Sequence, residues 1–384
     1  MEFESLESSL DKLSEYCKNA GYKGWDLFDG LNSRVLRATP LYRIKLLRLA
    51  WIQFFKRSPV NLRMLAMVPK GYNAKGLALF AAGLLKSGKM EEAEKLYAQL
   101  AKMTCSGYDG ICWGYNFDWE ARAFFVPRGT PNLVTTVFVV NSFLDYFDLT
   151  GREEPLQFAR GACKFLLKHL ILFEKAETLC FGYIPGEEAR VHNANMLGAA
   201  LLARVYAQTG EEMLLEKSRK AMTYSINALR KDFSWPYGER HHHQFVDNFH
   251  TGFNLVALHD WMTYTGDCCW EQQLTGAYKY FLDTFWLEDG CPKYYNNRLY
   301  PIDIHCSAQG ILTCLKLAGL DDRSLSMAHK IADWAMKNMM SSNGYFYYQK
   351  TKWYTNKNAY IRWSQAWMFY ALASLLINGK LVEQ

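Results

Sequence analysis

The sequence predicts an all-α protein, an (α/α)6 toroid in which six helical hairpins close into a ring. Three observations favour this fold. The predicted helices alternate between amphipathic ones and ones that are apolar on almost every side. Most of the apolar helices end at a glycine-containing turn at regular intervals along the chain. Long loops rich in aromatic and polar residues precede them. A repeated unit stacks on its copies, and a helix that is apolar all round has to be buried.

The repeat is visible in the spacing of the glycines that follow the apolar helices. They are Gly151, Gly210, Gly266, Gly319 and Gly379, which lie 59, 56, 53 and 60 residues apart. One glycine at a helix end is common, because the left-handed cap costs glycine nothing. Five on one period indicate a repeated hairpin. An open solenoid is the alternative, but its concave helices would normally be more polar.

In chain order, residues 1–40 are expected to form an N-terminal cap segment and residues 41–384 a single toroid domain. Apolar residues spaced by three or four predict a helix over 41–55, which Pro59 ends. We expect it to pair with the apolar helix 74–86. Five further pairs follow: 90–103 with 131–149, 153–173 with 193–208, 211–231 with 248–264, 268–286 with 304–318, and 323–340 with 361–377. Alternating runs in the loops (FFV, FGYI, YFYY) predict small β-hairpins.

Composition excludes several classes of protein. A net charge of +6 over 384 residues, without a Lys/Arg run, argues against a nucleic-acid partner. No apolar run approaches the roughly 20 residues of a membrane span, so the chain is not expected to be transmembrane. The first 30 residues lack a signal-peptide pattern, which predicts a cytoplasmic protein with reduced cysteines. The three histidines at 241–243 cannot easily face one ion, so neither a metal nor another cofactor is expected.

Polar residues recur where the apolar helices begin. His192, His250, His305 and Arg362 are spaced by 58, 55 and 57 residues, and in a toroid they would line one axial cavity. Asn and Asp at such positions can equally be helix caps, whereas His and Arg are poor caps. Helix N-termini also favour an anionic ligand. The neighbouring polar candidates are Asn195, Asp247 and Asp303.

The loops before these helices combine aromatic rings with charged side chains. Sugars need this combination, because rings stack on their C–H faces while polar groups bind the hydroxyls. Packing between hairpins explains about half of these aromatic residues equally well. The loop candidates for substrate contact are Trp113, Asp118, Trp119, Arg122, Trp235, Tyr237, Glu239, Tyr360 and Trp363.

With six hairpins and aromatic loops, the chain resembles the six-hairpin glycosidase-like superfamily of α/α toroids, which includes glycoside hydrolases, polysaccharide lyases and sugar epimerases. Its C-terminal segment WYTNKNAYIRWSQAWMFYAL resembles proteins of polysaccharide biosynthesis. The same segment is distantly similar to glucuronyl C5-epimerases, in which an Arg-Trp pair precedes the last inner helix. The resemblance implies an oligo- or polysaccharide partner and assigns that pair to Arg362 and Trp363.

These observations predict an enzyme acting on a glycan that contains uronic acid, with some role in polysaccharide biosynthesis or modification. An epimerase or lyase needs a base and a group that neutralises a carboxylate. A hydrolase needs two carboxyls across the bond. The residues of the right type are His250, His192, Tyr237, Tyr360, Asn195 and Arg362 for the former, and Asp118, Asp247, Asp303 and Glu239 for the latter.

Two other functions stay open. The same cavity suits a non-catalytic glycan-binding or scaffold protein associated with a polysaccharide assembly complex. It could also hold an isoprenoid lipid among the apolar helices, although the charged loops argue against that ligand. Mutation of Asp247 and His250 separates binding from turnover. Among the enzymes, an unsaturated product, solvent hydrogen in the sugar or a new reducing end would identify the reaction.

Overall fold

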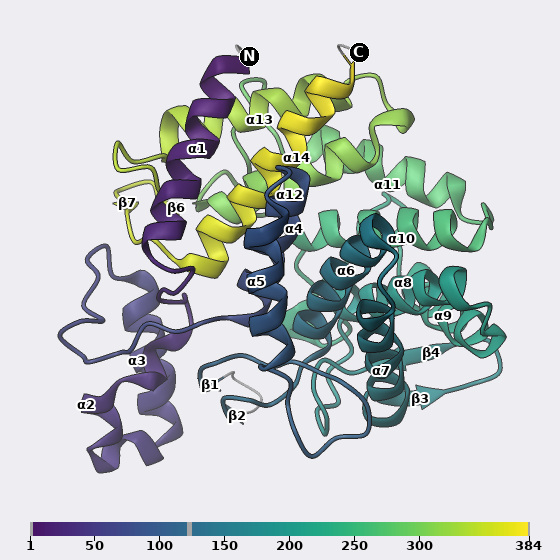
Figure 1. Cartoon of the computed structure of the whole chain (residues 1–384), viewed down its shortest axis with the longest axis horizontal. Coiled ribbons are helices and arrows are strands. Elements are labelled where there is room, and N and C mark those ends of the chain that lie inside the picture. The colour runs from purple at the N-terminus through teal and green to yellow at the C-terminus, as the bar shows by residue number, and fades with distance from the viewer. Residues whose placement is uncertain (1–2, 121–124, 383–384) are drawn as a thin grey trace.

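The computed structural model describes residues 3–120 and 125–382. Helices dominate this part of the chain, and the only strands in it form small antiparallel pairs and one three-stranded sheet (Figure 1). The predicted all-α class is therefore confirmed.

Six apolar helices form the inner ring. Each packs against the next one along the chain, and the last packs against the first, which closes the toroid. This closure excludes the open solenoid. The inner helices are α4 (Ala74–Lys86), α6 (Leu133–Thr150), α8 (His192–Thr209), α10 (Asn248–Thr265), α12 (Ile304–Lys316) and α14 (Trp367–Val382).

Six amphipathic helices cover the ring from outside. They are α1 (Phe3–Asn19), α5 (Met90–Ala101), α7 (Glu153–His169), α9 (Glu212–Ile226), α11 (Glu271–Thr284) and α13 (Ser324–Met339). Each of the last five packs mainly on the inner helix before it, across a short turn, and not on the inner helix after it as the sequence analysis paired them. Gly151, Gly210 and Gly266 make left-handed caps in three of these turns. Gly379, by contrast, lies inside α14, and α12 ends before Gly319.

The first predicted hairpin is wrong. Helix α3 (Lys45–Arg57) packs against the short turns Asp29–Asn32 and Pro40–Arg43 and against β1 (Trp119–Glu120), whereas α1 takes the outer position beside α14. We call residues 29–68, which include α2 (Arg34–Arg37) and α3, the projection, because they stand away from the ring in Figure 1. Since α1 belongs to the ring and α3 does not, the expected division at residue 40 does not follow the packing.

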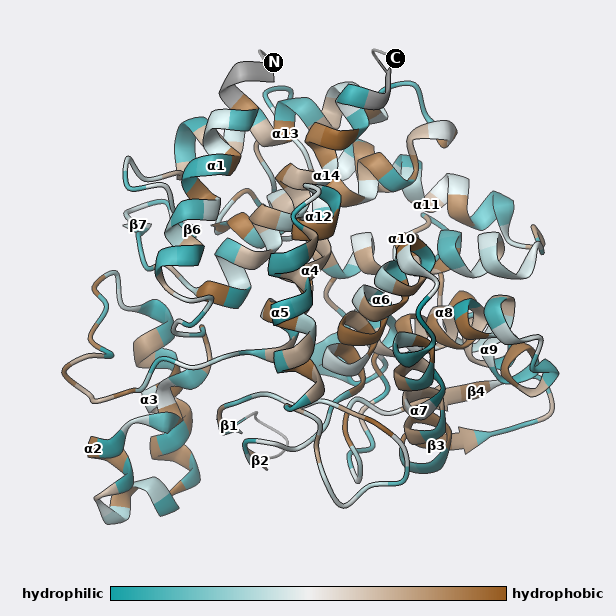
Figure 2. Cartoon of the chain, in the orientation of Figure 1, coloured by the Kyte–Doolittle hydropathy of each residue, from teal (hydrophilic) through white to brown (hydrophobic). Residues whose placement is uncertain are grey.

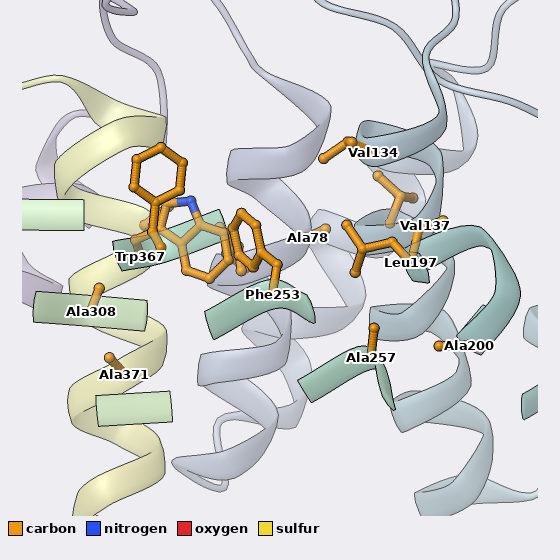
Figure 3. Packing of buried hydrophobic residues seen from close by; sticks show 14 of the residues in the cluster. Ala78, Val134, Val137, Leu197, Ala200, Phe253, Ala257, Ala308, Trp367 and Ala371 are labelled. Carbon is orange, nitrogen blue, oxygen red and sulfur yellow. The ribbon is translucent and has the colours of Figure 1, made fainter. Parts of the chain in front are cut away.

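Aromatic rings fill the middle of the inner ring. Phe253 and Trp367 lie side by side there, among small side chains such as Ala78 and Ala257 (Figure 3). The ring centres of Phe138, Phe253 and Trp367 are 5.1 to 5.6 Å apart. We call these three residues the aromatic plug. The projection has a small core of its own, formed by Leu31, Leu36 and Ile52.

Short strands lie in the loops, as predicted. They are β1 with β2 (Phe125–Val126), β3 (Ile171–Glu174) with β4 (Leu179–Phe181), and β5 (Ile302–Asp303) with β6 (Gln349–Lys350) and β7 (Thr355–Asn356). The runs FFV and FGYI overlap strands, whereas YFYY ends just before β6. Among the described helices, only α6 is long and apolar enough to span a membrane, and its burial in the inner ring, at 61%, accounts for that composition.

Candidate functional site

A cavity of about 470 Å³ opens at the end of the toroid where the long loops precede the inner helices. Aromatic rings from these loops form much of its wall, and the aromatic plug lies at its depth through Phe253. Such a volume suits a small ligand or one end of a larger one. Seven of the predicted site residues line it: Trp119, Tyr237, Asp247, His250, His305, Arg362 and Trp363.

Asp247 and His250 form a hydrogen-bonded dyad on the cavity wall. Asp247 is the N-cap of α10: its Oδ1 accepts the backbone N–H of His250 at 3.0 Å. Its Oδ2 lies 2.7 Å from His250 Nδ1. A carboxylate accepts, so we assign the ring proton to Nδ1, which leaves the lone pair on Nε2. Because Nε2 bonds to none of the described residues, His250 can act as a base toward a ligand.

Three tyrosines stand beside the dyad. The ring of Tyr237 lies 4.6 Å from that of His250. The hydroxyls of Tyr115 and Tyr183 are 3.1 Å apart. Burial raises the pKa of Tyr183 and of Tyr237 above its ordinary value, so both phenols keep their protons. Tyr183 and Tyr237 therefore offer neutral proton donors to a ligand in the cavity.

His305 is a buried imidazole without a hydrogen bond. It is 1% exposed, and neither ring nitrogen has a partner among the described residues. The rings of Trp363 and Trp367 lie 4.5 and 4.7 Å away. Burial, with the charge of Lys75 nearby, lowers its pKa well below the ordinary value, so it is neutral. Buried polar groups are nearly always bonded, so a polar group of a ligand could bind this imidazole.

Cationic side chains outnumber carboxylates on the wall. Arg362 donates two hydrogen bonds to Asp26, at 2.6 and 2.7 Å. Lys75 and Lys56 have no ion-pair partner among the described residues. Burial lowers the pKa of both, and the charge of Arg362 adds to this effect at Lys75. Asp247 is the single carboxylate lining the described cavity, so an anionic ligand is favoured.

Solved structures similar to this chain include several sugar-acting proteins. One is a variant of UGL with the oligosaccharide dGlcA-Glc-Rha-Glc. It aligns over 98% of this chain and 96% of that chain, with a TM-score of 0.66 and 12% identity. The GH76 α-mannanase of Bacteroides thetaiotaomicron covers 81% and 88%, with a TM-score of 0.64 and 11% identity. The cellobiose 2-epimerase of Bacillus thermoamylovorans covers 80% and 86%, with a TM-score of 0.62 and 14% identity.

This chain has the six-hairpin glycosidase-like fold. No family model and no curated protein matches the sequence. At such low identity the likeness shows the fold alone, and the chemistry has to be argued from the residues of the cavity.

Two carboxylates that were predicted as site residues, Asp303 and Asp118, lie outside the cavity. Asp303 accepts hydrogen bonds from Trp363 Nε1 at 2.9 Å and from the backbone of His305 at 3.0 Å. Burial raises its pKa to about 6. Asp118 is bound by Arg37, by Tyr42 and by the backbone of Arg128. Both carboxylates therefore support neighbouring elements instead of facing a ligand.

Two predicted residues of α8 also turn away from the cavity. His192 Nδ1 lies 3.3 Å from Ser225 Oγ on α9, and burial lowers its pKa to about 4. One residue further, Asn193 takes the position on the cavity wall. Asn195 is fully buried and bonds the backbone of Phe181 and of Ala221. The repeat placed the helix start correctly, but a shift of one residue rotates a side chain by about 100° around the helix.

The remaining predicted residues have structural roles. Trp113 and Trp235 are buried and donate their indole N–H groups to backbone carbonyls. Tyr360 accepts a hydrogen bond from Arg63 at 3.1 Å. Glu239 pairs with Arg190 near the surface. Arg122 lies outside the described residues.

Lys75 is the main residue that the sequence analysis missed. Its signal was visible, because it is a lysine in the first turn of an otherwise apolar inner helix. Its Nζ lies 4.0 Å from the centre of the Phe138 ring. The three histidines at 241–243 form a short turn, and two of them line the rim of the cavity. Among the described residues, no group of three metal-binding side chains is close enough to hold an ion.

Proposed function

We propose that the protein is a sugar epimerase that removes the proton next to a carboxylate or carbonyl carbon, with His250 as the base. The observation that carries this proposal is the Asp247–His250 dyad. Its Nε2 bonds to none of the described residues, and Asp247 is the one described carboxylate that lines the cavity. A glycoside hydrolase normally uses two carboxyls on either side of the bond. Asp118 and Asp303, the obvious second carboxyls, are held by other side chains.

The proposed reaction needs two proton transfers. His250 Nε2 takes the carbon-bound proton, and the electron pair passes into the neighbouring carbonyl or carboxylate group as an enolate. Lys75 and Arg362 line the same wall. An enolate beside Lys75 favours the protonated form of this buried amine, and Arg362, which Asp26 also binds, adds positive charge.

The proposed donor that returns a proton to the opposite face of the carbon is the neutral phenol of Tyr183, whose hydroxyl lies 3.1 Å from that of Tyr115. Tyr237 packs against the His250 ring and lies on the side of the base. The sugar leaves with one inverted centre and no net change in composition.

We propose a uronate-containing oligosaccharide as the substrate. The excess of cations on the wall supports this choice, because Lys56 and Lys75 have no ion-pair partner in the described chain. A carboxylate next to the reacting carbon would both bind to these groups and acidify the proton. A biosynthetic or modifying role, in the cytoplasm and on an oligomeric or lipid-linked intermediate, is the corresponding proposal at the level of the cell.

The decisive experiment is incubation of uronate-containing oligosaccharides with the protein in deuterated water. We expect deuterium at one sugar carbon, detected by mass spectrometry and NMR, and no incorporation with His250→Gln. An unsaturated product absorbing in the ultraviolet would identify a lyase instead, and new reducing ends a hydrolase. Binding without any turnover would overturn the enzymatic proposal and leave a glycan-binding protein.

A further inference from the structure

The projection exposes most of the large apolar side chains on the described surface. Sixteen such residues are exposed, and nine of them lie between Val35 and Met67. Leu46, Met64 and Leu65 are 73%, 75% and 79% exposed. Single exposed apolar residues are ordinary, whereas a dense group marks an interaction surface.

Helix α3 shows that this exposure is built into the element. Its buried residues Ile52 and Phe55 lie on one side, where Ile52 joins the small core that Leu31 and Leu36 form within the projection. The opposite side of the helix is exposed and carries Leu46, Phe54 and Arg57. Phe54 follows Leu46 by eight residues and Arg57 follows Phe54 by three, so the three side chains lie on one side of the helix. Both sides of α3 therefore carry large apolar residues, and only one of them is covered. Figure 2 shows brown segments along the projection.

The same region carries one sign of charge. From residue 30 to residue 90 the sequence has twelve Lys and Arg and no Asp or Glu. Arg43, Lys45 and Arg57 are exposed, and none of them has an ion-pair partner in the described part of the chain. Lys279 and Lys330 on outer helices also have no ion-pair partner in the described chain, so unpaired bases alone do not distinguish the projection. The absence of acids from residue 30 to residue 90 does distinguish it.

A second segment extends this surface. Trp353, in the turn between β6 and β7, is 83% exposed, the highest value among the exposed large apolar residues of the described chain. The hydroxyl of the adjacent Tyr354 donates to the carbonyl of Arg57 at 2.7 Å, and Asn356 donates to the carbonyl of Ser58 at 2.9 Å. These bonds hold the turn against the end of α3. This stretch is also free of acids, since residues 334–382 contain no Asp or Glu.

We propose that the projection, together with Trp353, binds the protein peripherally to an anionic lipid bilayer. Exposed Leu, Phe, Met and Trp among unpaired Lys and Arg are what such a surface attracts: apolar side chains enter the headgroup boundary while the basic groups bind lipid phosphates. A second copy of the chain fits less well. A two-fold interface would place this basic surface against itself, with like charges opposed.

Docking has a geometric consequence for the site. Lys56 belongs to α3 and lines the cavity, so the bilayer-facing element also forms part of the cavity wall. A protein bound in this way keeps its cavity close to the lipid surface. That position suits a substrate carried on a lipid. The membrane proposal itself depends on the projection and Trp353 and not on the proposed reaction.

Vesicle co-sedimentation of the full-length protein tests the proposal. We expect binding to phosphatidylcholine vesicles containing about one-third phosphatidylglycerol, weak binding to phosphatidylcholine alone, and loss of binding at high salt. Arg43→Glu and Lys45→Glu should each weaken binding by roughly five-fold or more. The pair Leu46→Ser and Leu65→Ser should weaken it as well. Leu149→Ser and Met213→Ser, two exposed apolar residues outside the projection, serve as matched controls.

Several outcomes would overturn the proposal. They are absence of binding to anionic vesicles, equal binding to neutral vesicles, or an equal loss in the controls and the projection variants. Light scattering tests one further outcome. If the protein is a dimer that Leu46→Ser and Leu65→Ser convert to a monomer, this surface binds a second copy of the chain and not a membrane. Circular dichroism confirms that each variant is folded, as expected for exposed positions.

Discussion

The carboxylate of Asp247 has two roles that can be separated by substitution. One oxygen caps α10, and the other orients His250. Asn is as good a cap as Asp, but its amide cannot hold the imidazole in the same tautomer through a charged bond. The choice between Asn and Ala at this position therefore distinguishes helix stability from chemistry.

Asp247→Asn and His250→Gln should each lower the rate of deuterium exchange by roughly 10²- to 10⁴-fold, the usual worth of a general base. The melting temperature of Asp247→Asn should stay close to that of the parent. Asp247→Ala should also lose about 1 kcal/mol of stability with the cap. Exchange rates and thermal unfolding measure the two effects. Full activity in His250→Gln would remove this residue from the reaction.

We expect Lys75 to strengthen ligand binding while it lowers the free energy of unfolding. Its amine is buried among the rings of Phe138, Phe253 and Trp367, and burial lowers its pKa. Lys75→Met keeps the length and removes the polar end, so we expect equal or higher resistance to urea and about ten-fold weaker binding of a uronate. Titration calorimetry measures the affinity. The matched variant Lys86→Met, at the far end of the same helix, should change neither quantity.

At the scale of elements, the sequence is informative about which helices are buried and less so about what covers them. The apolar composition of α6 and α8 identifies inner helices, because no exposed surface tolerates it. The amphipathic pattern of α3 is the same as that of an outer helix, and so its partner could not be read from its spacing. The starts of α10 and α12 were predicted closely enough to place His250 and His305. The rotation of His192 away from the axis was not predictable, since it depends on Ser225 of α9.

The contact between α8 and α9 should make the fold acid-sensitive. Burial gives His192 a folded-state pKa of about 4, below the ordinary 6.5. Above pH 6.5 the residue is neutral in both states. Between pH 6.5 and 4 the unfolded chain binds a proton that the folded site refuses, so stability falls as the pH falls, by up to about 3 kcal/mol.

Urea unfolding across this pH range should give a shallower decline for His192→Gln than for the parent. Some decline should remain, because the pKa of His305 is also lowered. His241→Gln, an exposed histidine, is the control and should follow the parent. An unchanged decline in His192→Gln would show that this histidine is not the acid-sensitive group.

For the whole molecule, closure of the ring depends on the two ends of the chain. Helix α1 covers α14, and α14 packs against α4, so the first and the last elements complete one circle. The N-terminal helix was expected to be a separate cap because it precedes the repeats. In a closed toroid, a helix that comes first in the sequence can either cap the ring or complete its outer layer, and its position in the sequence does not tell which.

If α1 is part of the ring, Leu13→Ala should cost about 2 to 5 kcal/mol, as for other fully buried leucines. Leu100→Ala on α5, equally buried, should cost a similar amount. Leu46→Ala, in the projection, should stay within about 0.5 kcal/mol of the parent. Urea denaturation measures all three. A change at Leu13 as small as that at Leu46 would mean that α1 contributes little to closure.

The aromatic plug limits how a glycan could enter this protein. Because Phe138, Phe253 and Trp367 pack against each other across the axis, a polymer cannot thread through the toroid. Ligand and product therefore enter and leave through the same mouth. A long glycan can meet the cavity only from the loop end of the toroid, either by one of its ends or by lying across the opening.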